Sequence, residues 1–178
     1  MRIVIFGTGG AGGYFGAQLS RAGQDVVFIA RGEHLNAIRS HGLRIDEPAG
    51  ETVIQPAQAT DDPSQVKDVD VIFVGVKAWQ VREAAEAMRP MIGPETFVVP
   101  LQNGVEAQSQ LASVLGPERV LGGLCGTLSW VTAPGHIRNV SGRGFVKFGE
   151  VDNRRSERAE RLRDAFAYRR GSSTRAYL

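Results

Sequence analysis

The fold is decided by the stretch Arg2-Ile3-Val4-Ile5-Phe6-Gly7-Thr8-Gly9-Gly10-Ala11-Gly12-Gly13. Residues 2–6 have the length and β-branched content of a fully buried parallel strand. The glycine run follows at once, and residues 14–22 then place apolar side chains at helical spacing. A strand, a glycine turn and a helix in this order are the context in which G-x-G-x-x-G indicates dinucleotide binding. The alternative is a glycine-rich turn that holds no ligand.

Each glycine of the motif answers a different physical need. Gly7 allows the tight turn out of the strand, and Gly9 lets the backbone approach a pyrophosphate closely. Gly12 lets the helix pack tightly on the strand. The free N–H groups at the helix start, together with the positive end of the helix dipole, would then hold the phosphates.

Composition indicates one domain with a real core, because 42% of the 178 residues are hydrophobic. No run of about 18 apolar residues is present, so no membrane span is expected. The chain opens on a core strand, which predicts no signal peptide. Cys125 is the single cysteine, which excludes an internal disulfide and fits a reducing, cytoplasmic setting. We interpret it as a small buried hydrophobe, and the three histidines lack zinc-site spacing, so no metal is expected.

The net charge of +2 comes from the end of the chain. Residues 168–178 hold Arg169, Arg170 and Arg175 and no acid, whereas the rest of the sequence is close to neutral. A nucleic-acid surface needs a basic stripe on the folded part, so no nucleic-acid partner is predicted. Residues 168–178 have no apolar period and are predicted to be a tail that follows a domain over residues 1–167.

The pattern along the chain is an alternation of apolar strands and helices. Strands are predicted at 25–30, 70–76, 96–99 and 120–124, which favours an α/β fold with a Rossmann-like, doubly wound parallel sheet. Residues 43–46 and 52–55 form a hairpin without evident chemistry. From residue 126 onward short strands predict antiparallel pairing at one edge of the sheet, and residues 155–167 form an amphipathic helix.

Candidate ligand-binding residues fall where the predicted parallel strands end. Ligands bind at the carboxyl ends of such strands, and the glycine loop, Arg31, Lys77 and Asn103 all lie there. Arg31 follows Gly12 by 19 residues, where NAD-binding folds usually place an acid. An arginine suits the 2′-phosphate of NADP(H) instead. The alternative is a solvated arginine that pairs with Glu33.

An ordered set of motifs extends beyond the opening one. These motifs are GTGGAGGYFGAQLSRAG (7–23), IAR (29–31), VKAWQV (76–81), PLQNGV (100–105) and GTLSWVTAPGHIRNVSGRGFVKFGE (126–150). Over residues 1–167 the chain resembles the N-terminal NADP-binding domain of the ketopantoate reductase (2-dehydropantoate 2-reductase) family. The resemblance implies NADPH-dependent reduction of the ketone of 2-dehydropantoate to (R)-pantoate, a step of pantothenate biosynthesis.

The resemblance also implies roles for single residues. Gly7, Gly9 and Gly12 would hold the NADPH pyrophosphate, with backbone contacts from Thr8, Gly10 and Ala11, and Arg31 would bind the 2′-phosphate. Lys77 and Asn103 would lie near the nicotinamide ribose and the small 2-keto acid substrate. A surface lysine at a helix start and an Asn-Gly turn residue are the alternatives for these two. Thr127 could approach the same crevice or face solvent, and Trp79 is interpreted as a packing residue.

The sequence departs from the family pattern after residue 167. Family members have a second, helical domain whose lysine is the general acid, and nothing in this sequence corresponds to it. The catalytic set is therefore expected to be incomplete, with slow or no turnover. The alternatives are a non-catalytic NADP(H)-binding module, a half-enzyme that uses a partner's helical domain, and a dehydrogenase for another 2-keto or 3-hydroxy acid. An exposed apolar face would also favour a homo-oligomer.

Overall fold

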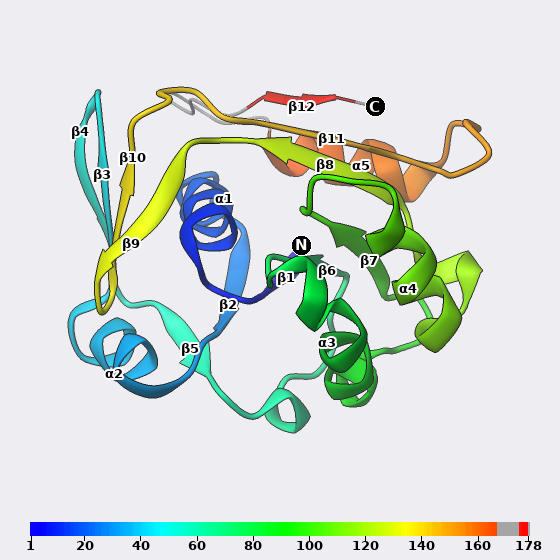
Figure 1. Cartoon of the computed structure of the whole chain (residues 1–178), viewed down its shortest axis with the longest axis horizontal. Coiled ribbons are helices and arrows are strands. Elements are labelled where there is room, and N and C mark those ends of the chain that lie inside the picture. The colour runs from blue at the N-terminus through cyan, green and yellow to red at the C-terminus, as the bar shows by residue number, and fades with distance from the viewer. Residues whose placement is uncertain (167–174, 178) are drawn as a thin grey trace.

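The central sheet of the computed structural model, which describes residues 1–166 and 175–177, has five parallel strands (Figure 1). Its order is β5-β2-β1-β6-β7, and every neighbouring pair is parallel. These strands are β1 (Arg2–Phe6), β2 (Asp25–Ile29), β5 (Gln58–Thr60), β6 (Val71–Val74) and β7 (Phe97–Pro100). The doubly wound α/β fold is thus confirmed. Sequence patterning missed β5, since three residues with two polar side chains carry no strand signal.

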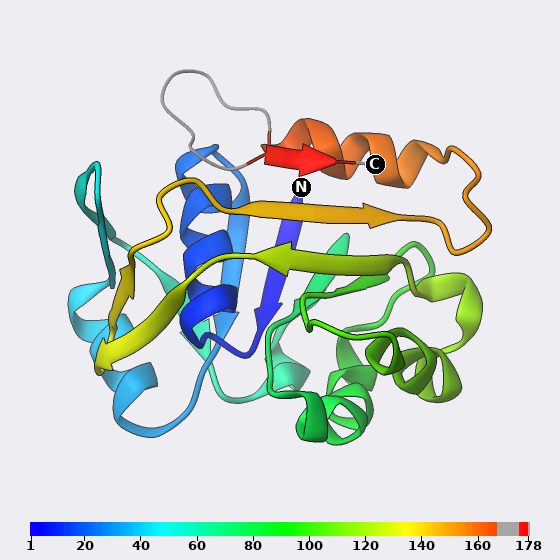
Figure 2. The same cartoon turned by 45° about the horizontal axis from the view of Figure 1, so that its top comes forward.

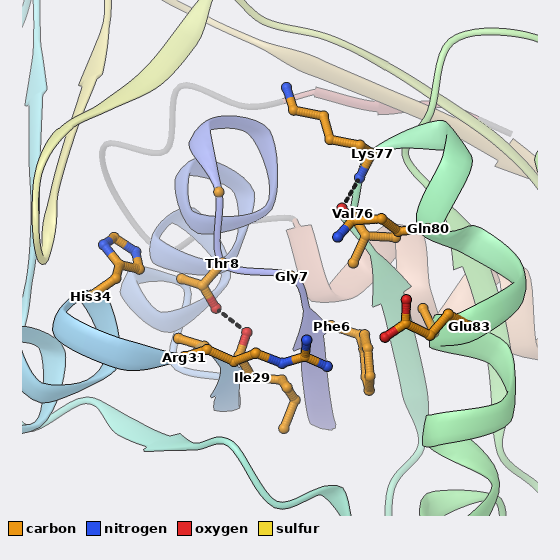
Figure 3. A pocket seen from close by; sticks show the side chains of 14 residues that line it. Phe6, Gly7, Thr8, Ile29, Arg31, His34, Val76, Lys77, Gln80 and Glu83 are labelled. Atoms are coloured by element: carbon orange, nitrogen blue, oxygen red, sulfur yellow. Dashed lines mark hydrogen bonds between the residues drawn. The ribbon is translucent and has the colours of Figure 1, made fainter.

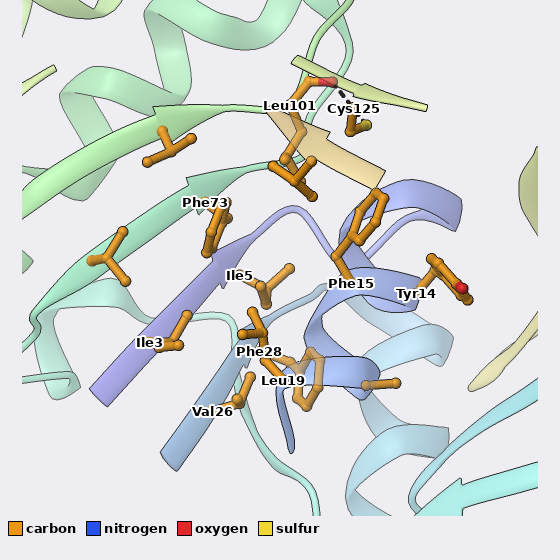
Figure 4. Packing of buried hydrophobic residues seen from close by; sticks show 14 of the residues in the cluster. Ile3, Ile5, Tyr14, Phe15, Leu19, Val26, Phe28, Phe73, Leu101 and Cys125 are labelled. Carbon is orange, nitrogen blue, oxygen red and sulfur yellow. Dashed lines mark hydrogen bonds between the residues drawn. The ribbon is translucent and has the colours of Figure 1, made fainter. Parts of the chain in front are cut away.

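Two hydrophobic layers enclose the sheet because successive residues of a strand point to opposite faces. Ile3 and Ile5 of β1 belong to one buried cluster, and Val4 and Phe6 belong to the other. The helices are α1 (Gly10–Arg21), α2 (Gly32–His41), α3 (Val81–Met88), α4 (Glu106–Leu115) and α5 (Glu157–Phe166). Side chains of α1 and α5 fill the first cluster, seen in part in Figure 4, while α3 and α4 fill the second.

The remaining strands form two smaller sheets of mixed parallel and antiparallel pairing beside the parallel one (Figure 2). The first has the order β4-β3-β10-β9 and the second β12-β11-β8. Their strands are β3 (Leu43–Glu47), β4 (Gly50–Ile54), β8 (Gly122–Gly126), β9 (Ser129–Ala133), β10 (His136–Asn139), β11 (Phe145–Gly149) and β12 (Arg175–Tyr177). The hairpin β3–β4 is joined to β10 by parallel pairing.

The segment predicted as a strand at residues 120–124 pairs with strands of two different sheets. Val120 makes an isolated parallel bridge to Val98, which lies in the edge strand β7. The chain then enters β8, whose antiparallel partner is β11. The predicted antiparallel extension therefore begins at this edge of the parallel sheet and continues as a separate sheet.

The structure differs from the prediction for Trp79 and describes only part of the predicted tail. Trp79 was expected to pack, and this is wrong, because its side chain is 81% exposed. It lies in a short 3₁₀ turn, Ala78–Gln80, where no periodicity indicates which side chains point inward. The predicted domain end at residue 167 and most of the predicted tail lie outside the described residues. Within that tail, residues 175–177 form β12, which pairs parallel with β11.

A buried carboxylate fastens α5 to the body of the domain. Glu150 follows β11, is 8% exposed, and accepts two hydrogen bonds of 2.7 Å from the guanidinium of Arg158. Arg158 also donates to the carbonyl of Glu118 at 2.7 Å and lies over the ring of Phe97. The hydrogen bonds from Arg158 are the main reason that the pKa of Glu150 is lowered from its ordinary 4.5.

We expect Arg158→Ala to lower the free energy of unfolding by about 3 kcal/mol, because it leaves a nearly buried carboxylate unpaired. Urea unfolding at pH 7 measures this loss. Because the folded-state pKa of Glu150 is lowered, its stabilising contribution is present above pH 4.5 and is lost as the pH falls below that value. The stability difference between wild type and Glu150→Gln should therefore shrink on acidification. A difference that is constant down to pH 3 would contradict this.

Candidate functional site

A crevice crosses the carboxyl ends of the parallel strands and consists of two adjoining pockets. The first has a volume of about 300 Å³ and is lined from the ends of β1 and β2 and from α2 and α3 (Figure 3). The second, of about 560 Å³, is lined from the start of α1, the loop after β7, and β8 and β9. Gly9, Gly75, Val76 and Lys77 line both pockets, so one long ligand could occupy the two together.

Three glycines at this turn, Gly7, Gly10 and Gly12, stand where a side chain could not be accommodated without strain or collision. Gly7 has a φ of +100°, a conformation that side chains strongly disfavour. A Cβ at Gly12 would lie 2.2 Å from the carbonyl oxygen of Gly7, so α1 can approach the turn only with glycine there. A Cβ at Gly10 would likewise collide with the carbonyl of Ser129, at the start of β9.

Gly9 is different, because nothing in the protein requires it to be glycine. Its φ of −83° is open to any residue, and a Cβ built on it would have no atom within 4 Å. Gly9 nevertheless lies where the two pockets meet. A bare backbone facing an open crevice is explained by the close approach of a ligand.

The start of α1 provides hydrogen-bond donors. The first turn of a helix has N–H groups without partners inside the helix, and the first turn of α1 holds no acidic residue. Thr8 is buried, and its hydroxyl donates to the carbonyl of Ile29 at 3.0 Å, which fixes the turn to the end of β2. Ala11 lines the second pocket at this helix end. This arrangement suits an anionic group such as a pyrophosphate.

Arg31 stands at the N-cap of α2, on the rim of the first pocket. Its guanidinium is exposed and makes no hydrogen bond or ion pair with any described residue, so the alternative of a pair with Glu33 is not seen. Figure 3 shows the guanidinium lying across the pocket, with the carboxylate of Glu83 pointing toward it from α3. Arg31 is thus free to bind an anion.

Lys77 and Asn103 meet at the second pocket. Lys77 follows β6 and directs its ammonium away from the Arg31 side (Figure 3). Asn103 follows β7, and its amide makes no hydrogen bond to any described residue. Thr127 lines the same pocket. Two polar side chains from neighbouring strand ends therefore converge on one space, as parallel topology requires.

Sequence reasoning missed two polar side chains that organise the crevice. The amide nitrogen of Gln102 donates to the carbonyls of Val74 and Val76, at 3.0 and 2.8 Å, and so links the loops that carry Asn103 and Lys77. His34 lines the first pocket, and its Nδ1 accepts a hydrogen bond of 2.9 Å from the backbone N–H of Gly135. Burial lowers the pKa of His34, which keeps the ring neutral at pH 7. The only sequence signal that could have indicated a place for His34 in the site is its position, three residues after Arg31.

Cys125 lies in the wall of the second pocket. Its side chain is buried, as expected, and its thiol donates to the carbonyl of Leu101 at 3.2 Å. Burial raises the pKa of this thiol to about 11. A thiol that stays protonated at neutral pH is a poor nucleophile.

Two site classes find no support in the part of the chain that the structure describes. No cluster of three or more histidine, cysteine or acidic side chains there could hold a metal ion. Among the same residues, no helix combines the length and the apolar character that crossing a bilayer demands.

Comparison with solved structures points to reductases. The crystal structure of 2-dehydropantoate 2-reductase from Porphyromonas gingivalis W83 superposes on 99% of this chain with a TM-score of 0.91. The two sequences are 33% identical, and the match covers 63% of the solved chain.

Comparison with protein sequences agrees. A 2-dehydropantoate 2-reductase of Mesorhizobium japonicum is 36% identical over 91% of this chain, and the uncharacterized oxidoreductase YkpB of Bacillus subtilis is 32% identical over 94%. The match covers 56% and 54% of these relatives, so the chain spans about half their length. The family model described as "Ketopantoate reductase PanE/ApbA" matches residues 3–153. The chain therefore belongs to the ketopantoate reductase family.

Proposed function

We propose that this chain is the NADPH-binding part of a reductase that converts the ketone of 2-dehydropantoate to the alcohol of (R)-pantoate. The observation that carries the cofactor assignment is Gly9, a glycine that no protein contact or backbone angle demands, at the junction of the two pockets. A pyrophosphate at the adjacent start of α1 explains why that position has no side chain.

The residues of the crevice fit this cofactor along its length. Arg31 pairs with the 2′-phosphate, because a planar guanidinium offers two parallel hydrogen bonds to phosphate oxygens. The nicotinamide end would then lie in the second pocket, where Lys77 and Asn103 line the wall. Bound NADPH supplies the hydride.

Lys77 and Asn103 act on the substrate side of the proposed site. Negative charge develops on the ketone oxygen during reduction, and a cation or an N–H donor near that oxygen lowers the barrier. In this proposal Lys77 attracts the 2-keto acid, whose carboxylate is anionic, and Asn103 orients it by hydrogen bonding. Both are positioning groups.

The proton that completes the alcohol needs another source. Of the described residues that line the second pocket, Cys125 holds its proton in a hydrogen bond to Leu101, and Lys77 is assigned to positioning. We propose that the general acid belongs to a helical domain, as in the family, and that this chain alone binds NADPH but reduces 2-dehydropantoate very slowly. We further propose a cytoplasmic location and self-association through exposed apolar side chains such as Leu128 and Trp130.

Two measurements test the proposal. Fluorescence titration should show saturable NADPH binding, and steady-state NADPH oxidation with 2-dehydropantoate should be far slower than with the Mesorhizobium reductase measured in parallel. Absence of NADPH binding would refute the cofactor assignment, and a normal turnover rate would refute the external general acid.

The half-enzyme alternative is favoured by one observation, that the matched relatives are nearly twice as long as the matched segment. It predicts a stable complex with a polypeptide that supplies the helical domain. Size-exclusion chromatography of this chain mixed with a full-length relative tests it, and elution as two unchanged species would count against it.

A further inference from the structure

An acidic side chain occupies the wall of the first pocket opposite Arg31, and the function proposed above gives it no role. Glu83 lies in the first turn of α3 and lines this pocket. Its carboxylate is exposed and makes no hydrogen bond or ion pair with any described residue. Figure 3 shows Glu83 and Arg31 facing one another across the opening, yet they form no ion pair.

The space between these two charges is apolar. Its floor and sides are formed by Phe6, Ile29, Val76 and Ala84. An apolar slot with polar groups at its rim suits a flat aromatic ring whose edges carry hydrogen-bonding groups. The ligand that complements both rims has an anion on the Arg31 side and a hydrogen-bond donor on the Glu83 side, because an ionised carboxylate can only accept.

We propose that Glu83 selects the base of the cofactor by accepting a hydrogen bond from the 6-amino group of adenine. This inference rests on the proposed NADPH site and deepens it. Adenosine 2′-phosphate carries its phosphate on the ribose and its amino donor on the far edge of the purine. Hypoxanthine has an oxygen in place of that amino group, and two acceptors facing each other leave both unsatisfied.

A purely structural role for Glu83 makes a different prediction. An acid in the first turn of a helix interacts favourably with the positive end of the helix dipole. That interaction exists with or without a ligand, and it is the same whichever purine occupies the slot. Discrimination between two purines therefore separates base recognition from helix stabilisation.

The test uses NADPH and its reduced hypoxanthine analogue, deamino-NADPH, as probes in fluorescence titrations. Wild type should bind NADPH about tenfold more tightly than the analogue, the effect of one charge-assisted hydrogen bond at an exposed rim. Glu83→Gln should bring this ratio below about twofold, because an amide can donate as well as accept. Glu86→Gln is the matched control, since Glu86 lies on the same helix, pairs with Arg89 at 2.6 Å and does not line the pocket. It should keep the tenfold ratio.

Three results would overturn the inference. Equal affinity of wild type for the two probes would refute base selection while leaving the proposed NADPH site intact. Tighter binding of both probes to Glu83→Gln by the same factor would show that Glu83 acts only by repelling phosphate. Failure of wild type to bind NADPH at all would refute the proposed function, and this inference with it.

Discussion

Gly9→Asp is expected to weaken dinucleotide binding by at least about 100-fold without weakening the fold. Aspartate is among the best N-cap residues, and its charge interacts favourably with the helix dipole. Gly9 is the N-cap of α1, and a Cβ added there has no atom within 4 Å beyond its chain neighbours. The same carboxylate would stand where the pyrophosphate is proposed to bind. Two like charges about 4 Å apart repel by about 4 kcal/mol at an effective dielectric constant of 20. Affinity for NADPH and for NADH should therefore fall by at least about 100-fold.

Gly12→Ala is the matched comparison within the same motif. We expect this substitution to lower the stability of the fold, whereas Gly9→Asp should lower cofactor affinity and leave stability intact. An added Cβ would lie 2.2 Å from the carbonyl of Gly7 and press on the side chain of Ile5. Relief of that collision requires α1 to move off the sheet, at a cost of about 3 kcal/mol in unfolding free energy. Thermal unfolding and cofactor titration of both variants separate the two roles. Normal NADPH binding by Gly9→Asp would contradict the proposal that the pyrophosphate binds at this turn.

The parallel sheet could be predicted from the sequence because its signals are local. Residues 3–6, 26–30 and 71–74 are continuous apolar runs, a pattern typical of strands that are buried on both faces. Because parallel strands have their carboxyl ends at the same edge of the sheet, residues that come just after those strands lie at that edge. This places Arg31, Lys77 and Asn103 there. Convergence of the candidate residues on one crevice is therefore a consequence of topology that needs no long-range information.

Features that depend on distant contacts could not be predicted. Helix α1 begins at Gly10, four residues before the predicted start, although glycine disfavours helices. Position 10 requires glycine all the same, because the carbonyl of Ser129, distant in sequence, fills the space that a Cβ would need. His34 joins the first pocket to a turn 101 residues away, at Gly135. Glu83 looks like any acid in a first helical turn, and only the fold places it opposite Arg31.

Arg31→Ala is expected to weaken NADPH binding by about 1–3 kcal/mol, or roughly 5- to 150-fold, as loss of a charge-assisted contact should. NADH lacks the 2′-phosphate, so its affinity should stay nearly unchanged. Parallel titrations of wild type and variant with both cofactors measure the difference. Raising the salt concentration should weaken NADPH binding to wild type more than to Arg31→Ala, because salt screens an exposed ion pair.

Arg39→Ala is the control that separates a specific contact from a general effect of charge. It removes the same charge from the same helix, but Arg39 donates to the carbonyl of Ala59 and lines neither pocket. If positive charge attracts NADPH only in a diffuse way, both variants should lose NADPH affinity equally. If the guanidinium of Arg31 pairs with the 2′-phosphate, only Arg31→Ala should lose NADPH affinity. Equal loss of NADPH and NADH affinity in Arg31→Ala would place this side chain against a part that both cofactors share. The 2′-phosphate assignment would then be withdrawn.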